Sequence, residues 1–372
     1  MKIVFLIDQV YRHGGIERVL SIKANYLASN SKNSVYIITS EQNKNKACYL
    51  FNSNIIFKDL GVNYHRNLSY FHPKNVLKIP RHIRLVKQTL NEIKPDIVVV
   101  CSHSVDTYFV PFVNKSIPKI KEFHFSKSIE VPYRKKGAKS KKKYFLYFAD
   151  YVEKKYNKLI VLNKDEAKYY KSNNIAVIPN PITFYPSQVS QLNKPIAIAA
   201  GRIAPVKRFD LLVDIWELIH KKNSDWQLHI YGEGDKNYID TLQKQINEKQ
   251  LSKHIILKGK TDNIQDKMLN ASVFLMTSDN ECFPLVLLEA QACGLPIVSF
   301  DCPHGPRNII NDKNGILIPP KKQSKFADAV INIINNETLR KKLGQHAREN
   351  AVNYNEKAIM DKWLTIFNQV IK

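Results

Sequence analysis

The sequence predicts an α/β fold of two doubly wound domains, in which helices cover both faces of a parallel sheet. Short apolar runs, typical of buried parallel strands, alternate along the chain with segments of helical periodicity. The alternation starts again after Pro179-Asn-Pro181, where two prolines interrupt regular structure. A chain of 372 residues is also too long for one ordinary core. We expect domains at residues 1–178 and 195–355, a linker at 179–194, and a last helix at 356–372.

The composition is that of a globular protein with a large positive charge. Hydrophobic residues make up 44% and charged residues 24%, which excludes a disordered chain. No apolar run is long enough to span a bilayer, and the apolar start ends at Asp8, too early for a signal peptide. The five cysteines have no Cys-x-x-Cys spacing, so we expect no zinc site, no disulfide framework and a cytoplasmic location. The formal net charge of +24 indicates an anionic partner or a lysine-rich solvated surface.

The first domain opens with a strand, a glycine pair and a helix. Lys2–Ile7 is the strand, and Gly14 and Gly15 precede an amphipathic helix. Free backbone N–H groups at such a helix start suit a phosphate, although a Gly-Gly pair alone is usually a turn. Further strands are expected at Val35–Thr39, Ile97–Val100, Leu159–Leu162 and Ile175–Ile178, with helices at 76–93 and 163–171.

A basic segment interrupts this domain. Residues 134–143 read RKKGAKSKKK and lead directly into the aromatic run Tyr144–Phe148. Basic residues beside aromatic ones suggest a segment that lies on an anionic bilayer. The same composition suits a nucleic-acid backbone with bases stacked on the rings, or a solvated loop before a core helix that carries Phe145, Phe148 and Val152. We favour the membrane and rank nucleic acid last.

The second domain repeats the strand–loop–helix pattern with cations in its first loop. The strand Ile196–Ala200 is followed by Arg202 and Lys207, before a helix that starts at Phe209. Two cations five residues apart can hold a diphosphate from two sides, although two exposed loop cations are the alternative. The tight loop at Gly232 is of the kind that borders a nucleotide.

The most informative stretch is residues 278–307, which predict a strand–loop–helix–strand unit. A helix from Pro284 to Gly294 is expected between apolar runs at 271–276 and 296–300. Glu281 precedes this helix, and Glu289 lies within it. A phosphate on the amides near Leu285 and Val286, with the glutamates on the two sugars, explains this pattern. A core helix with a capped Glu281 and a paired Glu289 is the alternative.

The run Glu281-Cys-Phe-Pro-Leu-Val-Leu-Leu-Glu289, with Ala290-Gln-Ala-Cys-Gly-Leu-Pro-Ile-Val298, resembles the signature of the family 4 retaining glycosyltransferases. These enzymes have two Rossmann-like domains that face a central cleft, the GT-B fold. In this family the last segment crosses back to the first domain, so the resemblance implies the same for the helix at 356–372. Many members have Gly where Cys282 and Pro284 stand here, and Pro284 has no N–H, so a phosphate must use later amides. Residues 302–310, CPHGPRNII, are similar to members that transfer galactose- or glucosamine-type residues from UDP to bacterial surface glycans.

The resemblance implies transfer of a hexose or N-acetylhexosamine, with retention, from a UDP-sugar to a lipid-linked or polysaccharide acceptor at the inner face of the plasma membrane. Arg202 and Lys207 would neutralise the diphosphate, Glu289 would bind the ribose, and Glu281 the donor sugar. His124, after the strand that starts at Lys119, would contact the reaction centre. Further donor contacts would come from Gly14, Gly15, Gly232, Lys260, Phe283, Leu285 and Val286. No Asp-x-Asp occurs, so neither a metal nor another cofactor is expected.

Three other functions fit parts of this pattern. A UDP-sugar epimerase of the same fold would need no acceptor and no membrane. A basic nucleic-acid-binding protein would bind heparin in a salt-dependent way and would not bind UDP. A sugar-nucleotide sensor would bind UDP without turnover.

Overall fold

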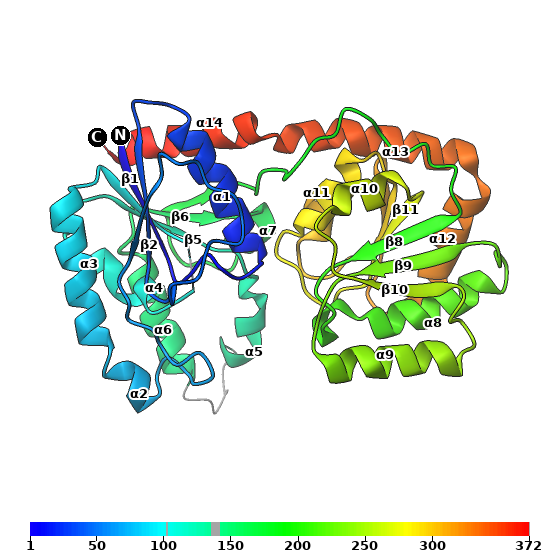
Figure 1. The fold of residues 1–372 in the computed structure, drawn as a ribbon, viewed down its shortest axis with the longest axis horizontal. Coiled ribbons are helices and arrows are strands. Elements are labelled where there is room, and N and C mark those ends of the chain that lie inside the picture. Colours follow the sequence, from blue (N-terminus) through cyan, green and yellow to red (C-terminus); the bar gives the residue numbers. More distant parts are fainter. Residues whose placement is uncertain (102, 135–141, 372) are drawn as a thin grey trace. The chain divides into compact units, whose positions relative to one another are not determined.

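A computed structural model describes residues 1–101, 103–134 and 142–371. The chain forms two compact units (Figure 1). Unit 1 contains Met1–Pro181 and the segment from Glu356 onward, and unit 2 contains Ile182–Asn355. Most of the basic segment, residues 135–141, lies outside the described residues.

Within the described residues, the sheet of unit 1 has seven parallel strands in the order β3-β2-β1-β4-β5-β6-β7. The strands are β1 Lys2–Ile7, β2 Ser34–Thr39, β3 Ile56–Asp59, β4 Ile97–Val100, β5 Lys119–Glu122, β6 Lys158–Val161 and β7 Ile175–Val177. Residues of β1 alternate between two hydrophobic clusters, so both faces of the sheet are covered. The sequence did not predict β3, because this edge strand is exposed along its whole length and lacks a buried apolar pattern.

Helices cover the two faces of this sheet (Figure 1). They are α1 Gly15–Ala28, α2 Pro73–Val76, α3 Ile79–Ile93, α4 Asp106–Phe109, α5 Val131–Arg134, α6 Lys142–Glu153, α7 Lys164–Ala167 and α14 Glu356–Val370. The helix expected at 163–171 is a single turn, α7, which Asn163 caps by accepting a hydrogen bond from the Glu166 amide.

Unit 2 is a second parallel sheet with the same topology. Residues 182–355, all described, form six strands in the order β10-β9-β8-β11-β12-β13, the order of a Rossmann fold. The strands are β8 Ile196–Ala200, β9 Gln227–Tyr231, β10 Ile255–Gly259, β11 Val273–Met276, β12 Ile297–Phe300 and β13 Gly315–Ile318. The helices are α8 Phe209–His220, α9 Lys236–Glu248, α10 Ile264–Leu269, α11 Leu285–Ala292, α12 Gln323–Asn335 and α13 Glu337–Ala351.

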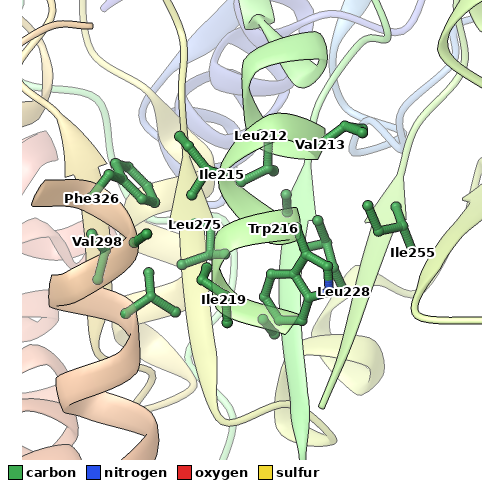
Figure 2. Packing of buried hydrophobic residues seen from close by; sticks show 14 of the residues in the cluster. Leu212, Val213, Ile215, Trp216, Ile219, Leu228, Ile255, Leu275, Val298 and Phe326 are labelled. Carbon is green, nitrogen blue, oxygen red and sulfur yellow. The ribbon is translucent and has the colours of Figure 1, made fainter. Parts of the chain in front are cut away.

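The core of unit 2 explains why α8 forms where it does. Apolar residues of α8 recur at helical spacing, and Figure 2 shows Ile215, Trp216 and Ile219 packed toward the sheet. Trp216 is fully buried. A helix of this kind is stabilised mainly by its packing against the sheet.

The stretch expected as a linker contributes buried residues to unit 2. Ile182, Ser190 and Leu192 are buried, and the Ser190 amide donates a hydrogen bond to the Cys293 carbonyl at 2.9 Å. The chain passes from unit 1 to unit 2 after Pro181.

The final helix packs in unit 1, although the residues before it belong to unit 2. One face of α14 places Ile359, Met360, Trp363 and Phe367 in the hydrophobic cluster beneath α1. Trp363 is 2% exposed and therefore completes the core on that face of the sheet.

We predict that Trp363→Ala lowers the free energy of unfolding by about 3–5 kcal/mol, because it leaves a cavity where a large side chain was fully packed. Equilibrium denaturation monitored by circular dichroism measures this loss. Lys362→Ala, an exposed position on the same helix, should change stability by less than about 0.5 kcal/mol. Equal losses in both variants would contradict the packing that we describe.

Candidate functional site

The candidate site of unit 2 begins at the carboxyl ends of β8 and β11. These neighbouring strands pair at Val273 and Ala197, and the strand order reverses between them. In open α/β sheets, this reversal creates the crevice where ligands bind. Gly201 directly follows β8, and Thr277 directly follows β11.

The loop after β11 holds the turn that carries Lys207. Thr277 Oγ1 donates hydrogen bonds to the carbonyls of Lys207 and Arg208, at 3.1 and 3.0 Å. The Asp279 amide donates to the Val206 carbonyl at 2.9 Å. Residues 205–207 form one turn of 3-10 helix, so these bonds fix the backbone from which the Lys207 side chain extends.

Lys207 and Glu281, two of the predicted site residues, form an ion pair. Lys207 Nζ lies 2.6 Å from Glu281 Oε1, and the side chains are 21% and 13% exposed. A partly buried pair is screened less by salt than a surface pair. Arg202, the other predicted cation, is exposed in the loop after β8. The ammonium group of Lys207 is thus held at a strand end, where a phosphate could compete with Glu281 for it.

The N-terminus of α11 lies next to this pair in sequence. Pro284 precedes the helix in an extended conformation, and no side chain among residues 182–355 caps it. Leu285 and Val286 are half-buried at the first turn, so their amides and the positive end of the helix dipole suit an anion. The helix ends two residues earlier than expected, at Ala292, because Gly294 adopts a left-handed φ of +75°.

Glu289, on α11, accepts a hydrogen bond from a residue that was not predicted as part of the site. Thr183 Oγ1 donates a 2.7 Å hydrogen bond to Glu289 Oε1, and Glu289 is 5% exposed. Thr183 lies in the stretch expected to be a linker, so only the nearby Pro179-Asn-Pro181 motif could have drawn attention to it. The hydrogen bond orients the buried carboxylate of Glu289 and lowers the free-energy cost of burying it.

Gly305 shapes the loop that carries Glu281. The Gly305 amide donates to the Glu281 carbonyl at 2.8 Å, and the Glu281 amide donates to the Pro303 carbonyl at 3.2 Å. A Cβ at Gly305 would lie 2.7 Å from Pro284 Cδ and 2.9 Å from the Glu281 carbonyl oxygen. Only glycine therefore fits this contact. Phe283, on the same loop, is buried with its ring centroid 5.8 Å from that of Tyr354.

The two remaining candidates of unit 2 lie on neighbouring loops. A Cβ at Gly232 would overlap the Gly201 carbonyl oxygen, so this glycine lets the loop after β9 pack against the loop after β8. Its amide donates to the Gly259 carbonyl at 2.9 Å. Lys260, which follows Gly259, is exposed.

Unit 1 contains the other predicted site residues, at the carboxyl edge of its own sheet. Gly14 precedes α1 in an extended conformation, without a side-chain cap among the described residues, and Gly15 is the first helical residue. His124 follows β5, and its Nε2 lies 3.1 Å from Glu122 Oε1. Burial raises the pKa of Glu122, but the charge of Lys23 and the hydrogen bonds from His124 and Lys23 lower it more, so this pKa lies well below its usual value. Glu122 was not predicted, because a carboxylate inside a strand has no sequence motif.

Comparison with known proteins identifies the family. Residues 183–350, nearly the whole of unit 2, match the family of glycosyl transferases group 1. Unit 2 therefore contains a glycosyl transferase group 1 domain.

The relatives act in bacterial glycan synthesis. The poly(ribitol-phosphate) alpha-N-acetylglucosaminyltransferase of Staphylococcus aureus is 34% identical over 220 residues, which are 58% of this chain and 44% of the relative. The chain thus spans less than half of that relative's length. The amylovoran biosynthesis glycosyltransferase AmsD of Erwinia amylovora is 25% identical over 99% of both chains.

Solved structures show the same fold. Anabaena Alr3699/HepE, solved in complex with UDP, has a TM-score of 0.78 at 18% identity and covers 99% of this chain and 100% of its own. The predicted GT-B fold of two Rossmann-like domains is therefore confirmed, as is the predicted enzyme class. The roles of individual site residues stay predictions.

We predict that Gly305→Ala destabilises unit 2 by about 1–3 kcal/mol and displaces the Glu281 backbone, because the added methyl group crowds Pro284. Thermal melting measures the loss. Gly259→Ala is the matched control, because a Cβ at Gly259 would meet nothing within 4 Å. Only the strain of a left-handed φ of +69° should then destabilise this variant, by about 1–2 kcal/mol. A smaller loss at Gly305 than at Gly259 would show that the loop accommodates the methyl group.

Proposed function

We propose that this enzyme transfers a hexose or N-acetylhexosamine from a UDP-sugar to a lipid-linked or surface-polysaccharide acceptor, with retention of the anomeric configuration. The observation that carries the proposal is the Lys207–Glu281 pair, close in the chain to the uncapped α11 N-terminus, at the strand reversal of unit 2. Two relatives, a poly(ribitol-phosphate) alpha-N-acetylglucosaminyltransferase and an amylovoran biosynthesis glycosyltransferase, support this class of acceptor. The UDP complex of the Anabaena protein supports the donor.

The chemistry follows from where charge develops. When the bond between sugar and diphosphate breaks, negative charge accumulates on the leaving UDP. Lys207 and Arg202 would stabilise that charge, together with the amides of Leu285 and Val286. Because these groups are cations and N–H donors, we propose that no metal is required.

The ion pair suggests an exchange when the donor binds. Lys207 would leave Glu281 for the diphosphate, and the Glu281 carboxylate would then accept hydrogen bonds from sugar hydroxyls. Glu289, oriented by Thr183, would bind the ribose hydroxyls. In unit 1, we assign Gly14 and Gly15 to phosphate binding and His124 to the donor sugar, without a role as general base.

The donor site is tested by thermal melting of the full chain with UDP, GDP or ADP. UDP at about 100 times its Kd should stabilise the protein by about 2.7 kcal/mol, which raises Tm by several degrees. Glu289→Ala and Lys207→Met should abolish the shift. Lys253→Met, which changes an exposed lysine of unit 2, should keep it. A preference for GDP or ADP would change the donor, and no shift with any nucleotide would contradict the transferase proposal.

We further propose that unit 1 binds an anionic membrane through α6. The described residues contain no helix that is long and apolar enough to cross a bilayer. Leu146, Ala149 and Val152 of α6 are buried, whereas its opposite face exposes aromatic rings. We call this face the α6 aromatic surface: Tyr144, Tyr147, Phe148 and Tyr151, which are 76%, 51%, 46% and 51% exposed.

Lysines lie over this surface. Lys155 Nζ is 4.9 Å from the Tyr151 ring centroid, and Lys143 and Lys171 are each 5.9 Å from that of Tyr147. Aromatic rings with cations beside them suit the headgroup region of an anionic bilayer. The alternative of a core helix that carries Phe148 does not hold at this residue, because Phe148 is nearly half exposed. Arg134 belongs to the basic segment and forms ion pairs with Asp150 at 2.7 Å and Glu130 at 2.6 Å, within unit 1.

We predict that the double variant Tyr147→Ser/Phe148→Ser binds phosphatidylglycerol vesicles at least about tenfold more weakly, because two exposed rings no longer enter the interface. Vesicle co-sedimentation at low and high salt measures this. Leu50→Ser removes an exposed apolar side chain elsewhere in unit 1 and should leave binding unchanged. Equal binding by the double variant and the unaltered chain would contradict this surface.

A further inference from the structure

A buried ion pair joins the two elements of unit 1 that carry site candidates. Lys23 lies on α1, about two turns after Gly15, and Glu122 ends β5, two residues before His124. Glu122 uses its two carboxylate oxygens separately: Oε2 contacts Lys23 Nζ, and Oε1 lies 3.1 Å from His124 Nε2. The side chains of Lys23 and Glu122 are each 2% exposed.

Aromatic side chains surround this pair. Lys23 Nζ is 4.4 Å from the Trp363 ring centroid, on α14, and 5.9 Å from that of Phe5, on β1. Charges in such surroundings are poorly solvated and interact strongly with each other. Trp363 therefore helps to hold the Lys23 ammonium group in place, and Lys23 in turn holds the Glu122 carboxylate.

The carboxylate determines which nitrogen of His124 carries the proton. An ionised carboxylate only accepts hydrogen bonds, so Nε2 of His124 must donate. In a neutral imidazole, Nδ1 then has the free lone pair and is an acceptor. Among the described residues, His124 Nδ1 makes no hydrogen bond of its own.

A second buried ion pair in unit 1 uses its carboxylate oxygens differently. Lys127 and Glu153 have side chains that are 1% and 6% exposed. Both oxygens of Glu153 accept hydrogen bonds from Lys127 Nζ, at 2.6 and 2.7 Å. Glu122, by contrast, gives one of its oxygens to a histidine at the carboxyl edge of the sheet, where ligands bind in this class of fold.

We propose that Glu122 is a positioning residue for the glycosyl transfer: held by Lys23, it fixes His124 as the Nε2–H tautomer and leaves Nδ1 to accept a hydrogen bond from a hydroxyl of the donor sugar. The role rests on the proposed function, since it assumes that His124 contacts the donor. Its chemistry needs no proton transfer to or from His124, in keeping with the absence of a general-base role.

The tautomer is measurable without any turnover. Nitrogen-15 NMR of the full chain, at a pH of about 8 where an unperturbed imidazole is neutral, should show His124 protonated on Nε2. The signal is assigned with His124→Gln. In Glu122→Gln the amide can also donate to Nε2, so the tautomers should mix or invert. Glu153→Gln, the matched control, removes another buried carboxylate, 6% exposed, and should leave the His124 signal unchanged.

Turnover gives the second readout. With UDP-N-acetylglucosamine as the probe and UDP release as the signal, Glu122→Gln should lower kcat by about 10- to 100-fold, the size of effect known for the partners that orient metal-binding histidines. KM should change by less than about twofold, because the donor contacts of unit 2 remain. Glu153→Gln should keep kcat even if it lowers Tm to a similar extent.

Two results would overturn the proposal: His124 protonated on Nδ1 in the unaltered chain, or Glu122→Gln with unaltered kcat and tautomer. If Glu122→Gln does not fold, Lys23→Met/Glu122→Gln removes both charges at once, and the same two readouts apply to it. No UDP release by the unaltered chain would overturn the proposed function with this donor, and the tautomer measurement would still decide how Glu122 acts on His124.

Discussion

Parallel hydrogen bonding between neighbouring strands is the constraint on which both units depend. Parallel strands need a crossover connection, so each unit must place helices on both faces of its sheet. The same geometry brings all carboxyl ends of the strands to one edge. Lys207, Glu281 and Glu289 of unit 2 follow strands that end there, although up to 82 residues separate them in the chain. The site is thus a consequence of the topology before it is a consequence of any single contact.

Motifs with a fixed local spacing could be predicted from the sequence. The two glutamates eight residues apart, the cations after β8 and the glycine pair before α1 each lie within one short stretch of the chain, so their local spacing could be recognised in the sequence. The repeated alternation of apolar runs and amphipathic segments also predicted both sheets. Element ends were less accurate: α11 ends earlier than expected, and α7 is a single turn.

Partners that meet only in three dimensions could not be predicted. Thr183 reaches Glu289 across 106 positions of the chain, and Lys23 reaches Glu122 across 99. The positive charge illustrates the same limit. Lys119 and Lys121 are buried lysines that donate to backbone carbonyls, and burial lowers the pKa of each to about 8. Part of the formal charge therefore serves the interior of unit 1 and is not available to a partner.

The path of the chain has a consequence for biosynthesis. Unit 2 is one continuous insertion, whereas unit 1 is assembled from both ends of the sequence. During translation, unit 2 can acquire its complete core while the last helix is still inside the ribosome. The hydrophobic cluster of unit 1 that contains α1 stays partly exposed until Trp363 and Phe367 are synthesised and pack against it. A chain that stops before α14 would thus have a complete core in unit 2 and an incomplete core in unit 1.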